Sequence, residues 1–100
     1  MAYQVIIEAP AQEDIKAALE WMAQSSGKRA TLWYYDLMEA IESLENFPKR
    51  CARAPENKYV KEEVRQLLFE KYRILFTIRD EYVYILHVRH QAQHRLSSDE

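Results

Sequence analysis

The feature of this sequence that most constrains its fold is a change in the spacing of apolar residues near position 64. Before that point, apolar side chains recur every three or four residues, which is the spacing of one face of an α-helix. After it they alternate with other residues, which is typical of half-buried β-strands. A chain of 100 residues has room for one hydrophobic core. The helical first part and the stranded second part must therefore pack together as a single α+β domain spanning residues 1–100.

The first part predicts a strand followed by a helical hairpin. Residues 3–8 are rich in β-branched and aromatic side chains, and this strand should join the sheet because a lone strand leaves backbone groups unpaired. Pro10 suits the first turn of a helix. A second helix should run over residues 28–46 and stop before Pro48. Gly27, between the two helices, is expected to adopt a left-handed conformation. The predicted apolar stripes are Ile15, Ala18, Leu19 and Met22, then Ala30, Trp33, Tyr34, Leu37, Ile41 and Leu44.

The second part predicts three strands in an antiparallel meander, giving the order β-α-α-β-β-β with the helices on one face of the sheet. The strands should cover residues 64–69, 72–78 and 82–90, preceded by a loop over residues 49–61. A three-residue loop at 79–81 would pair Ile78 with Tyr82. Arg73 and His87 would then lie opposite each other on the face left open for a partner. The predicted helix-covered residues are Ile74, Phe76, Ile78, Tyr84, Leu86 and Val88.

The composition excludes several classes of function. The only glycine, Gly27, excludes a glycine-rich phosphate-binding loop, which needs at least two. The only cysteine, Cys51, cannot form an internal disulfide, so a reducing cytoplasm is the expected location. The sequence contains no apolar run of about 18 residues, so no membrane span is predicted.

The net charge of −2 conceals an asymmetry between the two halves. Residues 1–48 carry three basic and eight acidic side chains, whereas residues 49–100 carry eleven basic and eight acidic ones. The basic half therefore suits an acidic partner. The pI of 5.9 lies well below the value of about 9 that is usual for nucleic-acid-binding domains.

The residues that could carry chemistry form a basic and imidazole cluster in the last strands. It could bind phosphate, with a histidine as proton donor, or it could pair with acidic groups of this chain or of a partner. His90 and His94 are four residues apart, which suits a helix and not a strand, and no cysteine or carboxylate completes a ligand set. We therefore expect no metal and no cofactor. The members of the cluster are Arg65, Arg73, His87, Arg89, His90, His94 and Arg95.

The run from residue 64 to residue 92 resembles the RelE/ParE superfamily of bacterial toxins. The family pattern is an arginine, a short turn, a Tyr-Arg pair, an apolar strand, an acidic turn and a last strand ending near a histidine. Here Arg65, Tyr72, Arg73 and His90 fit that pattern, and the resemblance extends over roughly residues 3–95.

The resemblance implies a toxin of a type II toxin–antitoxin pair, similar to ParE-like plasmid stabilisation proteins. Such a toxin is neutralised by a cognate antitoxin in a hetero-oligomer, and acidic antitoxin side chains would meet Arg65, Arg73 or Arg89. ParE-like members poison DNA gyrase. RelE-like members cut mRNA in the ribosome without a metal, and for that activity Arg73 and His90 would be catalytic, with Arg65, Arg89 and His94 as helpers.

Departures from the RelE pattern favour the gyrase toxin, which is not an enzyme. Gln93 stands where a further arginine is expected, and the tail after it has no tyrosine. Ribosome-dependent mRNA cleavage remains the alternative, and a member with weak or lost activity is a third reading. Glu70 stands where the family often has glycine, which would change the turn but not the fold.

Overall fold

The computed structural model describes residues 2–59 and 61–93 and confirms the predicted element order. β1 is the edge strand of a four-stranded sheet of order β1-β4-β3-β2, and it pairs with β4 in parallel. The other neighbouring strands are antiparallel, as the meander predicts. The main elements are β1 (Gln4–Ile7), α1 (Ala9–Ala23), α2 (Gly27–Glu42), β2 (Arg65–Phe69), β3 (Tyr72–Arg79) and β4 (Tyr82–His90).

The two helices form the predicted hairpin, but the connection differs from the expectation. Gly27 is not left-handed and instead opens α2. The Ser26 side chain accepts a hydrogen bond from the Arg29 N–H at 3.1 Å and so caps that helix. At the end of α1, the Ser25 and Ser26 N–H groups both donate to the Met22 carbonyl at 3.0 Å, so this helix ends without a left-handed glycine. α2 continues into the short 3-10 helix η1 (Ser43–Glu45).

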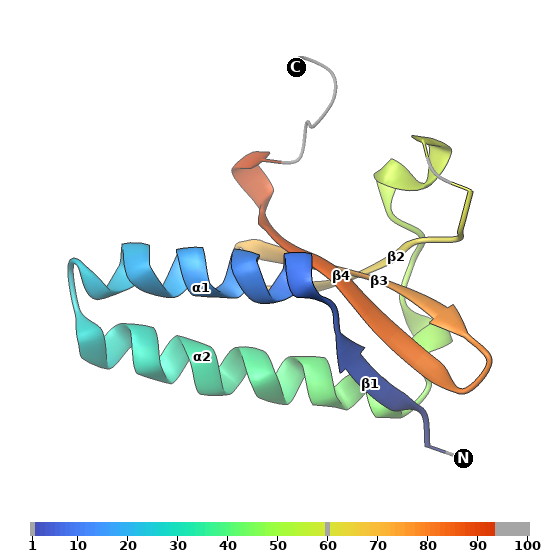
Figure 1. Cartoon of the computed structure of the whole chain (residues 1–100), viewed down its shortest axis with the longest axis horizontal. Helices are drawn as coiled ribbons and strands as arrows, with labels where there is room; N and C mark the ends of the chain where they lie inside the picture. Colours follow the sequence, from blue (N-terminus) through green and yellow to red (C-terminus); the bar gives the residue numbers. More distant parts are fainter. Residues whose placement is uncertain (1, 60, 94–100) are drawn as a thin grey trace.

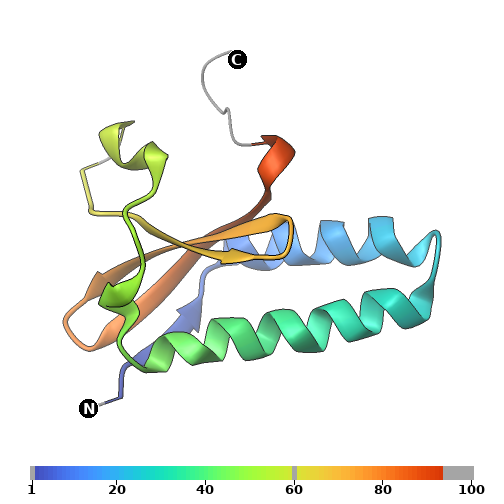
Figure 2. The ribbon, with the colours of Figure 1, turned by 180° about the vertical axis from the view of Figure 1, so that it is seen from behind.

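The main core lies between the helices and one face of the sheet, as predicted. Figures 1 and 2 show α1 and α2 side by side along this face. Trp33 of α2 packs against Phe69 and Tyr72, with ring centroids 6.2 and 5.1 Å apart. The buried members of this core are Ala11, Ile15, Met22, Ala30, Trp33, Leu37, Ile41, Leu44, Cys51, Ile74, Phe76, Val83, Ile85 and Val88.

The predicted register of β4 is wrong in two ways that partly cancel. The loop between β3 and β4 has two residues and not three, so Ile78 pairs with Val83. Leu86 is then an extra residue, because Phe76 pairs with Ile85 and Leu75 with His87. A one-residue shift moves every side chain to the other face, and a bulge moves the following ones back. Val83 and Ile85 therefore replace Tyr84 and Leu86 in the main core, whereas Val88 lies in it as predicted.

The face expected to be open is partly covered by residues 51–64, here called the covering segment. Ala54 and Val64 form a second small core with Leu75, and Leu86 packs against it. The Ala54 N–H donates to the Val64 carbonyl at 2.8 Å. In Figure 2 the green stretch of this segment crosses in front of the sheet. The region predicted as a loop contains two short 3-10 helices, η2 (Pro48–Arg50) and η3 (Pro55–Tyr59).

The chain enters η2 through an unusual residue. Phe47 has a φ of 49°, in the left-handed region, and its side chain is 80% exposed. The Arg50 guanidinium donates to the carbonyls of Asn46 and Phe47 at 2.7 and 3.1 Å. These bonds stabilise the bend in a conformation that a bulky side chain rarely adopts.

Candidate functional site

The centre of the candidate site is the buried guanidinium of Arg73 on β3. Its Nη2 lies 2.6 Å from Oε2 of Glu56, and its Nη1 lies 3.0 Å from Oε1 of the same carboxylate. Nη1 also donates to the side-chain carbonyl oxygen of Gln66 at 3.1 Å. Arg73 is only 5% exposed, so this is a two-pronged, charge-assisted contact in a largely dry environment.

The electrostatics of the pair hold Glu56 in its charged form. The hydrogen bond from Arg73 lowers the pKa of Glu56, and the positive charges of Arg73 and Arg89 add to that effect against the cost of burial. The Nε atom of Arg73 is buried and has no hydrogen-bond partner among the described residues. One N–H donor of the guanidinium is therefore buried without a hydrogen bond to the described part of the chain.

Arg89 extends this positive region along β4. It pairs with Arg73 in the sheet register, so the two side chains stand next to each other on the face away from the helices. Arg89 is half-buried. Two guanidinium groups and one carboxylate leave this part of the face with a net positive charge.

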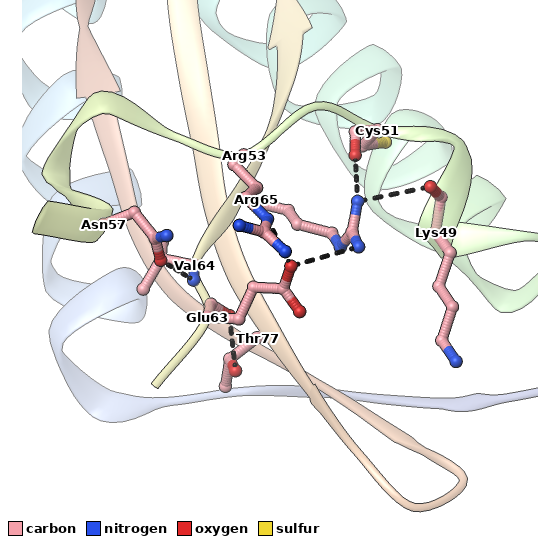
Figure 3. A network of polar contacts seen from close by, with 8 residues as sticks. All are labelled: Lys49, Cys51, Arg53, Asn57, Glu63, Val64, Arg65 and Thr77. Atoms are coloured by element: carbon pink, nitrogen blue, oxygen red, sulfur yellow. Dashed lines mark hydrogen bonds and ion pairs between the residues drawn. The ribbon is translucent and has the colours of Figure 1, made fainter. Parts of the chain in front are cut away.

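Arg65, which was also predicted here, is engaged in a separate network (Figure 3). Its guanidinium donates to the carbonyls of Cys51 and Lys49 at 2.6 and 3.2 Å. It also contacts the Glu63 carboxylate at 3.3 Å, and Glu63 pairs with Arg53 as well. Arg65 therefore fastens the start of the covering segment to β2, and its side chain stays only 18% exposed.

His90 lies on the opposite face from Arg73 and Arg89. It follows Arg89 directly on β4, and successive side chains of a strand point to opposite faces. Its ring contacts Tyr72 edge-on, with centroids 5.0 Å apart, and its Nδ1 accepts the Ala92 N–H at 3.0 Å. The two rings line a cleft of about 380 Å³ whose other walls include Ala18 and Trp21 of α1. Burial raises the pKa of Tyr72.

The structure thus separates the described members of the predicted cluster. Arg73 and Arg89 lie together, Arg65 belongs to the network at the covering segment, and His90 lies across the sheet. His94 and Arg95 lie outside the described residues. His87 does not face Arg73, because the register places it opposite Leu75.

His87 instead meets helix α1, in a contact that sequence reasoning missed. The Asp14 Oδ2 atom lies 2.9 Å from the His87 Nδ1 and also accepts the Val88 N–H at 2.9 Å. One carboxylate therefore ties α1 to the bulged part of β4. Glu56 and Gln66 were missed too, because nothing in the aperiodic covering segment indicates which of its acids reaches Arg73.

Cys51 shows no sign of activation. It is buried, and burial raises the pKa of its thiol in spite of the nearby Arg50 and Arg65. A raised pKa disfavours the thiolate that nucleophilic chemistry requires. Within the described residues, no group of three or more histidine, cysteine or acidic side chains could hold a metal ion, and no helix is both long and apolar enough to cross a membrane.

Comparison with known proteins identifies relatives of this architecture. The family model described as the ParE toxin of the type II toxin–antitoxin system parDE matches residues 5–95. Among solved structures, a chain of the chromosomal ParDE system from P. aeruginosa is 20% identical, with a TM-score of 0.75 over 89% of this chain and 96% of that chain. A chain of the RelBE2 toxin–antitoxin complex from Mycobacterium tuberculosis is also 20% identical, with a TM-score of 0.58 over 90% and 99%. No curated protein sequence matches.

Proposed function

The chain belongs to the ParE toxin family of type II toxin–antitoxin systems, and we propose that it inhibits growth by binding DNA gyrase. A cognate antitoxin, encoded beside it, binds and neutralises it in the cytoplasm. In this proposal the protein acts by binding and not by catalysis.

The observation that carries the proposal is the separation of Arg73 from His90. Cleavage of RNA needs a proton donor and a cation that stabilises the phosphorane, both reaching the same phosphate. Here the two side chains lie on opposite faces of the sheet, and Glu56 already holds the Arg73 guanidinium. The pI of 5.9 also argues against extensive phosphate contact.

The antitoxin is expected to bring acidic side chains to Arg65, Arg73 and Arg89. Antitoxin segments of this kind would fold on binding and bury a large area. Because Arg73 is buried against Glu56, the half-buried Arg89 offers positive charge for a first contact at this face.

The second candidate is a RelE-like, ribosome-dependent mRNA endoribonuclease. One observation favours it: His90, Tyr72 and Trp21 line a single cleft. Aromatic rings can stack an unpaired RNA base, and an imidazole beside them could donate a proton to a leaving group.

The experiment compares the two proposed activities directly, inhibition of gyrase and cleavage of mRNA. Purified protein is added to gyrase in a supercoiling assay and, separately, to a translation reaction whose mRNA is mapped for cuts. The proposal predicts loss of supercoiling with intact mRNA, and Arg73→Ala should weaken this effect. Cuts in the ribosomal A site by wild-type protein, absent with His90→Ala, would promote the second candidate.

A further inference from the structure

The end of the molecule that holds the β3–β4 turn contains a cleft separate from the one beside His90. Its volume is about 480 Å³, within the range of roughly 300–1,000 Å³ that is usual for binding sites. Figure 1 shows the β3–β4 turn and the start of β1 at the end of the molecule opposite the turn of the helical hairpin. Arg73 and Arg89 pair nearer the other end of the β3–β4 hairpin. The cleft is here called the Phe47 cleft, and its lining includes Tyr3, Phe47, Lys49, Asp80 and Glu81.

Phe47 is held at this cleft by a well-fixed backbone. Its side chain is 80% exposed, whereas Leu44 and Pro48 on either side of it are fully buried. The Arg50 guanidinium donates to the carbonyls of Asn46 and Phe47, and the Arg50 N–H donates to the Phe47 carbonyl at 3.0 Å. Because burial and hydrogen bonds fix the chain on both sides, the exposure of the Phe47 ring does not come from a loosely held loop.

Two residues of the lining have a left-handed backbone. Phe47 has a φ of 49° and Asp80 a φ of 55°. In the described part of the chain, Glu70 is the one other non-glycine residue with a positive φ. Aspartate tolerates this region better than phenylalanine, but glycine would form either bend at less steric cost. Strained residues cluster at binding and catalytic sites, so two of them at one cleft indicate that their side chains are needed there.

The lining combines aromatic rings with exposed carboxylates. Phe47 and Tyr3 supply the rings, and Asp80 and Glu81 form the β3–β4 turn. Neither carboxylate forms an ion pair with another described residue. A guanidinium suits such a lining, because it stacks on an aromatic ring and donates paired hydrogen bonds to a carboxylate. Lys49 also lines the cleft, but two carboxylates and one ammonium leave it with a net negative charge.

We propose that the Phe47 cleft receives an arginine side chain of gyrase, which stacks on Phe47 and pairs with Asp80 and Glu81. This inference rests on the proposed function for the identity of the partner. Charge distinguishes the two partners of the toxin. Acidic antitoxin side chains suit the positive region of Arg73 and Arg89, and the carboxylates of the Phe47 cleft would repel them. The toxin therefore presents opposite charges to its antitoxin and to its target, on different parts of its surface.

The test uses the full-length protein and measures both direct binding to gyrase and inhibition of supercoiling. Phe47→Asn removes the ring and introduces a residue that tolerates a left-handed backbone, whereas Phe47→Tyr keeps a ring. Asp80→Asn combined with Glu81→Gln removes both charges with little change of shape. The matched control is Glu70→Asn, which removes an acidic side chain from the same backbone conformation at the turn between β2 and β3. Circular dichroism and thermal unfolding check that each variant folds.

We expect Phe47→Asn and the double variant each to bind gyrase roughly tenfold more weakly than wild type, as the loss of a central contact predicts. Phe47→Tyr and Glu70→Asn should bind like wild type. Wild-type binding should weaken as the salt concentration rises, and the double variant should show less of this dependence because its carboxylates are gone. Every variant should still bind the product of the neighbouring gene.

The outcomes separate this inference from the proposed function. If wild type inhibits gyrase and the folded Phe47→Asn and double variants inhibit it equally well, the Phe47 cleft is wrong while the proposed function stands. The same conclusion follows if these variants lose the antitoxin and keep gyrase. If wild-type protein neither binds nor inhibits gyrase, both fail.

Discussion

Glu56 and Arg73 form a two-pronged ion pair, with O–N distances of 2.6 and 3.0 Å, between the covering segment and the middle strand of the meander. Both side chains are mostly buried, at 15% and 7% exposed. A buried pair of this kind contributes little net free energy while intact, but removing one partner leaves the other charge without compensation.

Glu56→Ala should therefore lower the free energy of unfolding by about 2–3 kcal/mol, since Arg73 would remain buried without its carboxylate. The matched control is Glu62→Ala. Glu62 pairs with Arg79 at the same distance of 2.6 Å, but both side chains are about half exposed. Loss of that pair should cost much less than loss of the buried pair, because solvent screens exposed ion pairs. Urea unfolding measures both, and equal effects would contradict the structural role of the buried pair.

The same pair predicts a pH dependence of stability. Because the pKa of Glu56 is lower in the folded protein than its usual value near 4.5, the unfolded chain binds the proton more tightly. The stabilisation is therefore fully present above about pH 4.5 and is lost as pH falls through the folded-state pKa. Thermal unfolding should be measured between about pH 6 and about pH 3. The loss of stability on acidification should be smaller in Glu56→Gln than in wild type. Parallel curves would count against the assignment.

Glu70 offers a stabilising substitution. It lies in the two-residue turn between β2 and β3 with a φ of 54°, a conformation that glycine adopts without steric cost. Glu70→Gly should raise the free energy of unfolding by about 0.5–1 kcal/mol. Lys71→Gly in the same turn is the control, since Lys71 does not have a positive φ. Glycine there only raises the conformational entropy of the unfolded chain, so this variant should lose stability. A loss of stability in Glu70→Gly would show that the Glu70 side chain outweighs the backbone cost.

Asp14 should be more important to the bulge than its surface position suggests. Its Oδ2 accepts hydrogen bonds at the His87 ring and at the Val88 N–H. Asp14→Ala leaves that N–H without its partner and should cost about 1–2 kcal/mol. Glu13→Ala, at an exposed neighbouring position, should change stability by less than about 0.5 kcal/mol. Amide exchange at Val88 checks the cause: it should accelerate only in Asp14→Ala.

The functional prediction tests Arg73 and His90 separately, because their side chains lie on opposite faces of the sheet. In growing cells, Arg73→Ala should reduce toxicity, and His90→Ala should leave DNA-damage signalling and filamentation intact. The measurement is a damage-response reporter together with mapping of mRNA ends. A His90→Ala variant that loses toxicity together with mRNA cuts would contradict the gyrase proposal.

Periodicity predicted the elements well because the main core is formed by regular faces of helices and strands. The strand 82–90 has the predicted bounds, and the apolar stripe of α2 is buried apart from the half-buried Tyr34. What failed depends on contacts distant in sequence. The bulge at Leu86 is tied to Asp14, more than 70 residues away. The covering segment has no periodicity, so its burial of Arg73 could not be read from it.

The parallel pairing of β1 with β4 has a consequence for how the protein is made. Gln4 pairs with Tyr82, so β1 can enter the sheet only after β4 has been synthesised. The helical hairpin is complete by Glu42, but the strands whose face it covers begin only at Arg65. During synthesis its apolar stripes therefore remain without a partner surface, and contacts so distant in sequence form slowly. The sheet can therefore be completed only when nearly the whole chain has left the ribosome.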